Sequence, residues 1–416
     1  MKQQWTLCVL GCLTGLAAAT TTEPREVRLF FDGQSPPMAF AAEELRVALV
    51  GAGYAVQAQP LPPTTGGAVI SERDWTILLC TWAQRSLWVS AQTQAAEHLV
   101  GPEAFAVHRR GREVCIVGSD VRGAMYGALD VAEIVRLTGS LDAVEGHTAQ
   151  PSIGRRGIKF NIPLDARTPS YDDTGDAAQA NYLHMWDFDF WRAFLDDLAR
   201  YRYNTLTLWN PHPFPSMIRC PDYPDVALDD VCVTTLKPRY ESGSWREPQF
   251  VSPTVLANLR VVKTMTMEDK IAFWRKVMRH AKDRGIDVYI ITWNVVVNGA
   301  EGKYGITAEQ TNPKTIAYLR QSVRELILTY PDLAGIGVTA GEHMRNREDE
   351  YDREKWLWQT YGMGVVDAKK ASPDREVRFI HRVWNTGLQK IMRDFAAKYL
   401  DSFEIGFKYA RAHMYS

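Results

Sequence analysis

Short apolar runs typical of strands alternate with longer amphipathic stretches typical of helices along most of the 416-residue chain. In the first part, this pattern predicts strands at 27–31, 75–80, 104–108 and 114–118 and a helix at 39–51. After Gly118, either Ser119 or Asp120 can cap a further helix, in which Gly123 and Gly127 permit close packing on a sheet. We therefore expect a small N-terminal α/β domain at residues 24–150.

A second alternation begins after a Gly-, Ser- and Pro-containing connection at 139–155. Its predicted strands are 157–161, 205–209, 286–293, 333–339, 377–383 and 403–408, and its predicted helices are 188–201, 267–284, 312–328 and 386–399. Such alternation gives βαβ units and a parallel sheet, either a barrel or an open sheet. Because no strand leads into a Gly-rich phosphate loop, the open nucleotide-binding sheet lacks support.

The fold class predicted from this pattern is α/β, a small N-terminal domain followed by an incomplete (β/α)8 TIM barrel at residues 155–416. About six barrel strands are visible, whereas a closed barrel of this type has eight. We therefore expect the sequence to be truncated at its C-terminal end. A long insertion at 211–266 separates the second strand from the helix that follows it.

Composition is that of a soluble globular protein, with 46% hydrophobic and 23% charged residues. The formal net charge of -1 gives no global attraction to nucleic acid or to an anionic membrane surface, so neither is an expected partner. Thirteen Trp and seventeen Tyr supply flat aromatic faces, on which sugar rings stack, although most such side chains fill cores. No apolar run after the N-terminal segment approaches the length of a membrane span.

The first 20 residues resemble an export signal. Lys2 provides the positive end, residues 7–16 the apolar stretch, and Ala17, Ala18 and Ala19 a small-residue cleavage region. Two alternatives remain: a short buried strand or helix, and a lipoprotein cleavage site at Cys12. We expect a signal peptide at residues 1–20 and a secreted or periplasmic protein.

Four cysteines follow the signal, and none has CxxC spacing. Cys80 and Cys115 lie in strand-like apolar runs and are expected to be buried thiols. Cys220 and Cys232 flank one loop and either form a disulfide in an oxidising compartment or remain free. No His belongs to a metal-ligand spacing, so we expect no metal and no cofactor.

Candidate chemistry gathers at the predicted strand ends, where barrels carry their working residues. Polar and aromatic side chains recur there, at Asn161, Trp209, Asn210, Trp293, Asn294, Glu342, His343, His381, Arg382, Trp384 and Lys408. Glu342 follows an apolar strand, and Gly341 beside it leaves room for a substrate. A carboxyl desolvated in a barrel mouth has a raised pKa, as a general acid near neutral pH requires. The alternative is a loop Glu paired with Arg345 or Arg347.

Two segments resemble known glycosidases. Gly-Ser-Asp followed by Gly-x-x-Tyr-Gly-x-Leu, from Gly118 to Leu129, resembles the end of the domain preceding the barrel in α-glucuronidases and β-hexosaminidases. Tyr-Pro-Asp-Leu-Ala-Gly-Ile-Gly-Val-Thr-Ala-Gly-Glu resembles strand four of family 67 α-glucuronidases, in which the terminal Glu is the acid. Glu342 matches that Glu, and the order of the motifs extends the resemblance to residues 25–410.

The resemblance implies that Arg382 and Lys408 hold the carboxylate of an acidic sugar. It also implies substrate contacts for the other strand-end side chains, namely Trp209, Asn210, Trp293, Asn294, His343, His381 and Trp384. Each of these side chains could instead serve packing or an ordinary salt bridge.

The sequence departs from both families. After Lys408 it lacks the carboxylate that would activate water, so the second carboxylate of a glycosidase mechanism is unassigned. Gly341 replaces the Asp of the Asp-Glu pair that β-hexosaminidases use. The expected function is a glycoside hydrolase acting on a polysaccharide-derived oligosaccharide, which could contain uronic acid. The alternatives are a non-catalytic carbohydrate-binding barrel and, with no motif behind it, a lyase or isomerase using His381 and Glu342.

Overall fold

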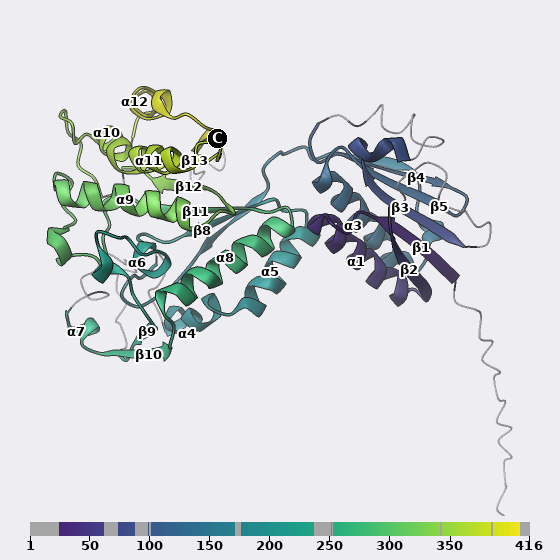
Figure 1. Cartoon of the computed structure of the whole chain (residues 1–416), viewed down its shortest axis with the longest axis horizontal. Coiled ribbons are helices and arrows are strands. Elements are labelled where there is room, and N and C mark those ends of the chain that lie inside the picture. The colour runs from purple at the N-terminus through teal and green to yellow at the C-terminus, as the bar shows by residue number, and fades with distance from the viewer. Residues whose placement is uncertain are drawn as a thin grey trace, which may run out of the picture. The chain divides into compact units, whose positions relative to one another are not determined.

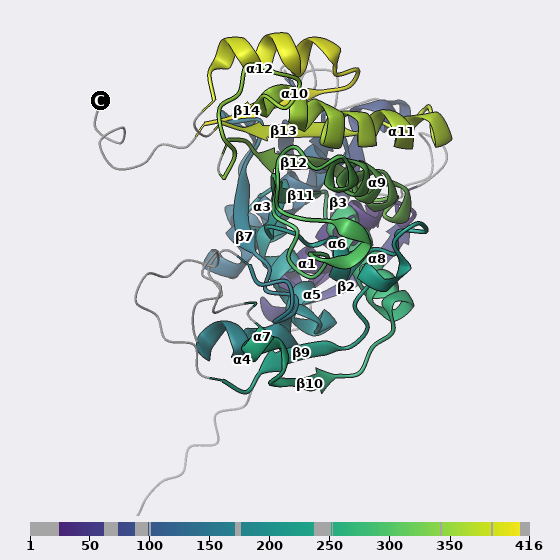
Figure 2. The ribbon, with the colours of Figure 1, turned by 90° about the vertical axis from the view of Figure 1, so that its left-hand side faces the viewer.

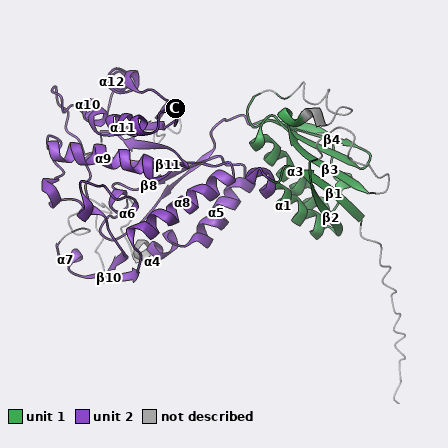
Figure 3. Ribbon diagram, in the orientation of Figure 1, with its two compact units in different colours: residues 1–33, 41–150 green, residues 34–40, 151–416 purple. Residues whose placement is uncertain are grey.

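A computed structural model gives the architecture of the chain (Figure 1). It describes residues 25–61, 74–87, 99, 101–170, 176–236, 251, 253–341, 343–383 and 386–407. The predicted signal peptide lies outside these residues. The chain separates into two compact units between Gln150 and Pro151, with the short segment 34–40 grouped with the second unit (Figure 3).

The first unit is built on a six-stranded sheet with the order β2-β1-β3-β5-β4-β6. Its strands are β1 (Arg25–Phe31), β2 (Tyr54–Pro60), β3 (Trp75–Thr81), β4 (Phe105–Arg110), β5 (Glu113–Gly118) and β6 (His147–Ala149). β1, β2, β3 and β5 pair in parallel, whereas β4 is antiparallel to both β5 and β6. Its helices are α1 (Pro36–Gly51) and α3 (Val121–Thr138). The sequence analysis missed β2 and β6.

Helix α3 sits close to its sheet because small residues face the strands. Asp120 caps the helix, since its carboxylate accepts hydrogen bonds from the backbone N–H groups of Gly123 and Glu103, both at 2.8 Å. A Cβ at Gly123 would lie 2.2 Å from the carbonyl oxygen of Ala104. The close packing that the sequence predicted for this glycine is therefore confirmed.

The second unit contains a six-stranded sheet in which every neighbouring pair is parallel, with the order β14-β13-β12-β11-β8-β7 (Figure 2). Its strands are β7 (Gly157–Asn161), β8 (Thr205–Trp209), β11 (Asp287–Trp293), β12 (Leu333–Thr339), β13 (Arg378–Arg382) and β14 (Phe403–Gly406). The sheet curls into part of a barrel. The predicted fold class, a small α/β domain followed by an incomplete TIM barrel, is confirmed.

Helices follow one another around the outside of this sheet, since α5 packs against α8 and α9 against α11 (Figures 1 and 2). They are α5 (Phe188–Arg200), α8 (Met267–Asp283), α9 (Pro313–Thr329), α10 (Arg353–Leu357), α11 (Met363–Ala371) and α12 (Leu388–Asp394). A further helix, α4 (Asp176–Met185), precedes α5 and packs mainly on the insertion that follows β8. Thr266 caps α8 through a reciprocal capping box with Asp269. Phe160 of β7 packs on Trp191 and Phe194 of α5, which covers that side of the strand.

The insertion after β8 folds into structure that the sequence pattern did not predict. It contains the short helices α6 (Phe214–Met217) and α7 (Pro253–Leu256) and an antiparallel hairpin of β9 (Val231–Thr234) and β10 (Leu259–Lys263). Lys270 of α8 is buried beneath it and donates to the carbonyl oxygens of Leu228, at 2.7 Å, and Asp230. Burial lowers the pKa of this ammonium to about 8. The lysine thus fastens the insertion to the barrel.

The charged run at 345–355 is exposed only in part. From Arg353 it forms helix α10, which continues through a π-helical turn (Trp358–Gly362) into α11. Together these segments are the barrel helix between β12 and β13. Asp352 and Glu354 are buried although they are acidic, because each has a basic partner, Lys390 and His381 respectively. Hydrophobic periodicity therefore did not reveal this helix.

Gly335 of β12 allows the neighbouring strand to approach. A Cβ at Gly335 would lie 1.9 Å from the carbonyl oxygen of Arg378 on β13. We predict that Gly335→Ala lowers the free energy of unfolding by about 1–3 kcal/mol, because the backbone of β13 must shift. Gly387→Ala is the matched control, since no atom lies within 4 Å of its Cβ position. Thermal unfolding of both variants checks this, and equal stability of the two would contradict it.

Candidate active site

Strand register decides which side chains share the concave face of the curled sheet. Residues paired between parallel neighbours point to the same face. One level joins Asn161, Trp209, Ile291, Gly337 and Ile380 across five strands. The next level joins Trp293, Thr339, Arg382 and Gly406, at the carboxyl ends of β11, β12, β13 and β14. These two levels form the concave strand-end surface.

An aromatic and cationic cluster occupies this surface. The rings of Trp209 and Trp293 meet edge to face with centroids 5.6 Å apart. The Nζ atom of Lys159 lies 4.5 Å from the centroid of Trp209, and the Cζ atom of Arg382 lies 6.0 Å from it. We call Lys159, Trp209, Trp293 and Arg382 the inner cluster. It combines apolar ring surface with two positive charges.

The two tryptophans of the inner cluster are largely covered. Trp209 is 8% exposed and Trp293 is 2% exposed, since both pack with Tyr289, Ile291 and Val296. Neither offers a full ring face for stacking in this structure. They form the floor of the concave surface, so the sugar stacking expected of them stays a prediction.

Lys159 was missed by the sequence analysis, which considered only the last residue of β7. It alternates with Phe160, whose ring packs outward on α5, so its side chain lies on the concave face with Asn161. Lys159 is exposed, unlike the tryptophans. The strand Gly157–Asn161 carried a usable signal, because a lysine between two apolar residues marks the polar side of a strand.

Asn210 and Asn294 use their amides on the protein's own backbone. Both are fully buried. Asn210 donates to the carbonyl oxygen of Ile162 at 2.9 Å and accepts from the N–H of His212 at 2.9 Å. Asn294 donates to the carbonyl oxygen of Thr339 at 3.0 Å and accepts from the N–H of Val295. These amides therefore lie between the carboxyl ends of neighbouring strands and connect them by hydrogen bonds. They do not face a sugar-binding surface.

Tyr361 adds a second tie to the end of β11. It accepts a hydrogen bond from the hydroxyl of Thr292 at 2.7 Å and donates to the carbonyl oxygen of Trp293 at 2.8 Å. Its hydroxyl is buried, which raises its pKa well above the usual range. The π-helical turn at Trp358–Gly362 carries this tyrosine, and such turns often occur near functional sites.

His212 supports the neighbouring loop as a neutral imidazole. Its Nδ1 lies 2.6 Å from the carbonyl oxygen of Asn298 and its Nε2 lies 3.1 Å from the hydroxyl of Tyr318. These contacts fit Nδ1 as donor and Nε2 as acceptor. Burial lowers the pKa of His212 to about 4, so the ring is uncharged at neutral pH. The histidine after β8 is thus part of the scaffold beneath the rim.

Glu342, Trp384 and Lys408 lie outside the described residues. The flanking backbone is unusual, since Gly341 and His343 adopt positive φ values of 78° and 71°. A left-handed non-glycine residue such as His343 costs about 1 kcal/mol or more and is often found at functional sites. Arg353 holds the following residue by donating to the carbonyl oxygen of Met344 at 2.7 and 3.1 Å. The turn after β12 is therefore strained and anchored.

His381 is placed on the opposite face from the inner cluster. It is fully buried between Phe395 and Phe403, and its Nε2 lies 2.8 Å from a carboxylate oxygen of Glu354, also fully buried. The sequence placed His381 among the substrate-binding residues. Because side chains alternate along a strand, only its neighbours Ile380 and Arg382 share the concave face. We assign His381 a packing role.

Further expectations concern the cysteines, a metal site and a membrane span. Cys220 and Cys232 are free, buried thiols rather than a disulfide, and burial raises the pKa of Cys220 to about 12. Cys80 and Cys115 are buried thiols, as predicted. Within the described ranges, no cluster of His, Cys, Asp and Glu side chains could hold a metal ion. None of the described helices is long and apolar enough to cross a bilayer.

Comparison with known proteins links this architecture to glycoside hydrolases. No protein-family model and no curated protein sequence matches the chain. A solved GH138 enzyme targeting pectin rhamnogalacturonan II is similar in structure, with a TM-score of 0.66 and 21% identity, over 92% of this chain and 38% of that one. The GH20 β-N-acetylhexosaminidase from Streptomyces coelicolor A3(2) gives a TM-score of 0.51 and 12% identity, over 92% of this chain and 65% of that one.

This chain therefore spans less than two thirds of the length of either enzyme. At such low identity, the similarity shows a shared fold, an α/β unit followed by barrel strands. This shared fold agrees with the expected resemblance to β-hexosaminidases. The closer resemblance to family 67 α-glucuronidases stays a prediction.

The buried pair of Glu354 and His381 gives a test of how α10 is held against β13. We predict that Glu354→Ala lowers the free energy of unfolding by about 1–3 kcal/mol, because it leaves the buried Nε2 of His381 without its hydrogen-bond partner. The double variant Glu354→Leu with His381→Leu should lose less stability than either single leucine variant. Denaturant unfolding measures this cycle, and additive single effects would contradict the pairing.

Proposed function

We propose that this protein is a glycoside hydrolase that acts on an oligosaccharide derived from a polysaccharide. The observation that carries the proposal is the composition of the strand-end level at which β12 ends. Thr339 is paired there with Trp293 and with Arg382, and Glu342 follows three residues later in the sequence. In parallel barrels this rim is where catalytic residues stand. The fold shared with solved glycoside hydrolases supports the same reaction class.

Glu342 is the proposed general acid. A glycosidic oxygen is a poor leaving group until it is protonated, and a carboxyl in a desolvated site supplies that proton near neutral pH. Support comes from the neighbouring backbone, because His343 is a non-glycine residue with a positive φ of 71°. Left-handed backbone of this kind costs stability and is often found at functional sites. The partner carboxylate of the mechanism is not assigned.

The substrate we propose carries a uronic acid, in line with the resemblance to α-glucuronidases. Two cations of the inner cluster support this. Lys159 and Arg382 both lie near the Trp209 ring, with Nζ and Cζ at 4.5 and 6.0 Å from its centroid, on the concave face. A guanidinium binds a carboxylate with two parallel hydrogen bonds, and an ammonium adds a point charge. Lys408 is a further proposed cation of this set. We also propose that the protein is secreted or periplasmic, which rests on residues 1–20 of the sequence alone.

A non-catalytic carbohydrate-binding barrel is the second candidate. One observation favours it. Asp165, the carboxylate that follows β7, is fully buried and accepts hydrogen bonds from the guanidinium and backbone of Arg167 and from the backbone N–H of Cys232. A carboxylate used in this way is not placed to activate water. Hydrolysis of any glycoside by the full-length protein would decide between the two candidates.

Glu342→Gln tests the proposed acid. We predict a fall in kcat of at least about 100-fold on substrates with sugar leaving groups, because the amide cannot give up a proton. Activity on aryl glycosides with acidic phenol leaving groups should fall far less, because these leave without protonation. Glu348→Gln is the matched control in the same loop and is exposed. Equal losses on both substrate types would remove Glu342 from the role of acid.

Arg382 tests the proposed charge recognition. We predict that Arg382→Ala raises KM for uronide substrates by at least about tenfold, because a charge-assisted hydrogen bond contributes roughly 1.5–3 kcal/mol. KM for matched neutral glycosides should change little. Arg382→Lys keeps the charge without the planar fork and should give an intermediate KM. The same loss for uronides and neutral glycosides would show that Arg382 does not recognise a carboxylate.

A further inference from the structure

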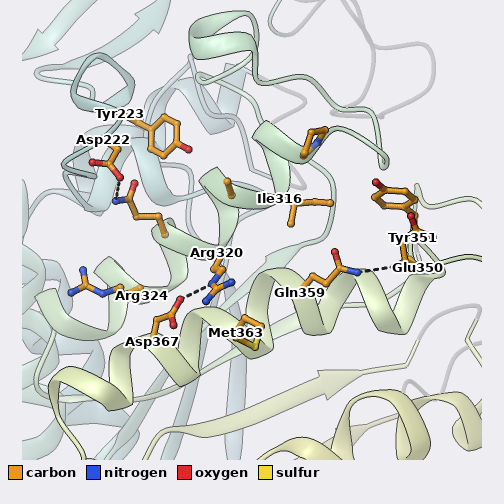
Figure 4. A pocket seen from close by; sticks show the side chains of 13 residues that line it. Asp222, Tyr223, Ile316, Arg320, Arg324, Glu350, Tyr351, Gln359, Met363 and Asp367 are labelled. Carbon is orange, nitrogen blue, oxygen red and sulfur yellow. Dashed lines mark hydrogen bonds and ion pairs between the residues drawn. The ribbon is translucent and has the colours of Figure 1, made fainter.

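A groove lined by polar and apolar side chains lies on the outside of the barrel, away from the inner cluster. It runs between α9 and the segment formed by the π-helical turn and α11, and has a volume of about 570 Å³ (Figure 4). Pockets of about 300–1,000 Å³ are the usual size for small-molecule sites. Nothing in the proposed hydrolytic mechanism uses this groove.

The groove follows α9 along one stripe of the helix. Its lining residues Pro313, Ile316, Arg320 and Arg324 recur every three or four positions, so they stand above one another. This stripe covers eleven residue steps, or roughly 16 Å at the rise of an α-helix. The groove is therefore longer than a single sugar ring and would take several linked units.

Close packing of the two helices shapes the floor. A Cβ at Gly364 of α11 would lie 2.7 Å from the carbonyl oxygen of Arg320 on α9. The two helices therefore approach closely at Gly364. This contact forms the floor of the groove, and neighbouring side chains of both helices form its walls. Ile316 and Met363 supply apolar surface, and Arg320 is paired with Asp367 at 2.5 Å (Figure 4).

Two tyrosines mark opposite sides of the groove. Tyr223, in the segment after β8, and Tyr351, in the loop after β12, both line it and are half-buried (Figure 4). The loops that bear them both follow carboxyl ends of barrel strands. Both loops therefore contribute to the lining of the groove beside α9.

Charge argues against an anionic ligand. The lining includes the guanidinium groups of Arg320 and Arg324 and the carboxylates of Asp222, Glu350 and Asp367. Arg320 pairs with Asp367, and Arg324 pairs with Glu325. Two cations against three carboxylates give no positive field, so a phosphate or a uronate run is disfavoured. The paired guanidinium and carboxylate groups can instead form hydrogen bonds with the hydroxyl groups of a neutral sugar. The tyrosine rings and the apolar surface beside them can pack against its C–H faces.

We propose that the groove between α9 and α11 is a second carbohydrate-binding site, which holds a neutral stretch of the polysaccharide while another part of it occupies the strand ends. This inference rests on the proposed function only because both sites are proposed to bind carbohydrate. It adds binding without taking part in bond cleavage. Its loss should weaken attachment to polymers and leave the hydrolysis of small aryl glycosides unchanged.

Affinity electrophoresis of the full-length protein tests the site, with gels containing arabinan, galactan, xyloglucan or arabinoxylan as neutral polymers and polygalacturonate as an acidic one. We expect retardation by at least one neutral polymer. Ala317→Arg, which fills the groove from an exposed position, should weaken the measured affinity at least about tenfold. Tyr351→Ala should weaken it similarly, and Tyr351→Phe should preserve it because the ring face remains. Tyr201→Ala, which removes a tyrosine that is 76% exposed elsewhere, is the control.

The outcomes separate this inference from the proposed function. If no neutral polymer retards the protein, or if Ala317→Arg and Tyr351→Ala bind as the wild type does, the second site is wrong. Glu342→Gln should be retarded as strongly as the wild type, because the groove does not depend on catalysis. If no glycoside is hydrolysed but the groove variants still lose polymer binding, the proposed enzyme fails and the binding site stands.

Discussion

The parallel register of β7, β8, β11, β12, β13 and β14 is the constraint on which the site depends. Parallel pairing brings all six carboxyl ends to one rim, and the pleat sends alternate side chains to the concave face. Residues far apart in the sequence, such as Lys159 and Arg382, are thereby brought to one tryptophan ring. Without this register, the inner cluster would not exist.

Where the strands end and backbone pairing stops, side-chain hydrogen bonds connect the carboxyl ends of neighbouring strands. The amides of Asn210 and Asn294 connect the ends of β7, β8, β11 and β12 through backbone groups, and Tyr361 supports the carbonyl of Trp293. Buried polar groups must be satisfied, and these are satisfied by neighbouring strand ends. A rim held in this way would keep loop residues in place, as the proposed glycosidase activity requires.

The barrel strands and their order could be predicted because each apolar run stops at a polar or glycine-containing turn. The faces of β13 could not. Phe379 and His381 alternate with Ile380 and Arg382, so both faces contain an apolar and a polar residue. A strand that is covered on both faces lacks the alternation of apolar and polar residues that would show which side chains point to the concave face. Helix α10 was missed for a related reason, since Glu354 is buried with a partner that lies 27 residues away and no local pattern shows it.

The concave strand-end surface is the proposed sugar-binding site. A crystal structure of the full-length Glu342→Gln protein, soaked with an oligosaccharide that the wild type cleaves or binds, tests this most directly. We predict a sugar ring on the concave face beside Trp209 and Trp293, with its acidic group near Arg382. A sugar found only elsewhere on the barrel, with this surface filled by protein side chains, would contradict it.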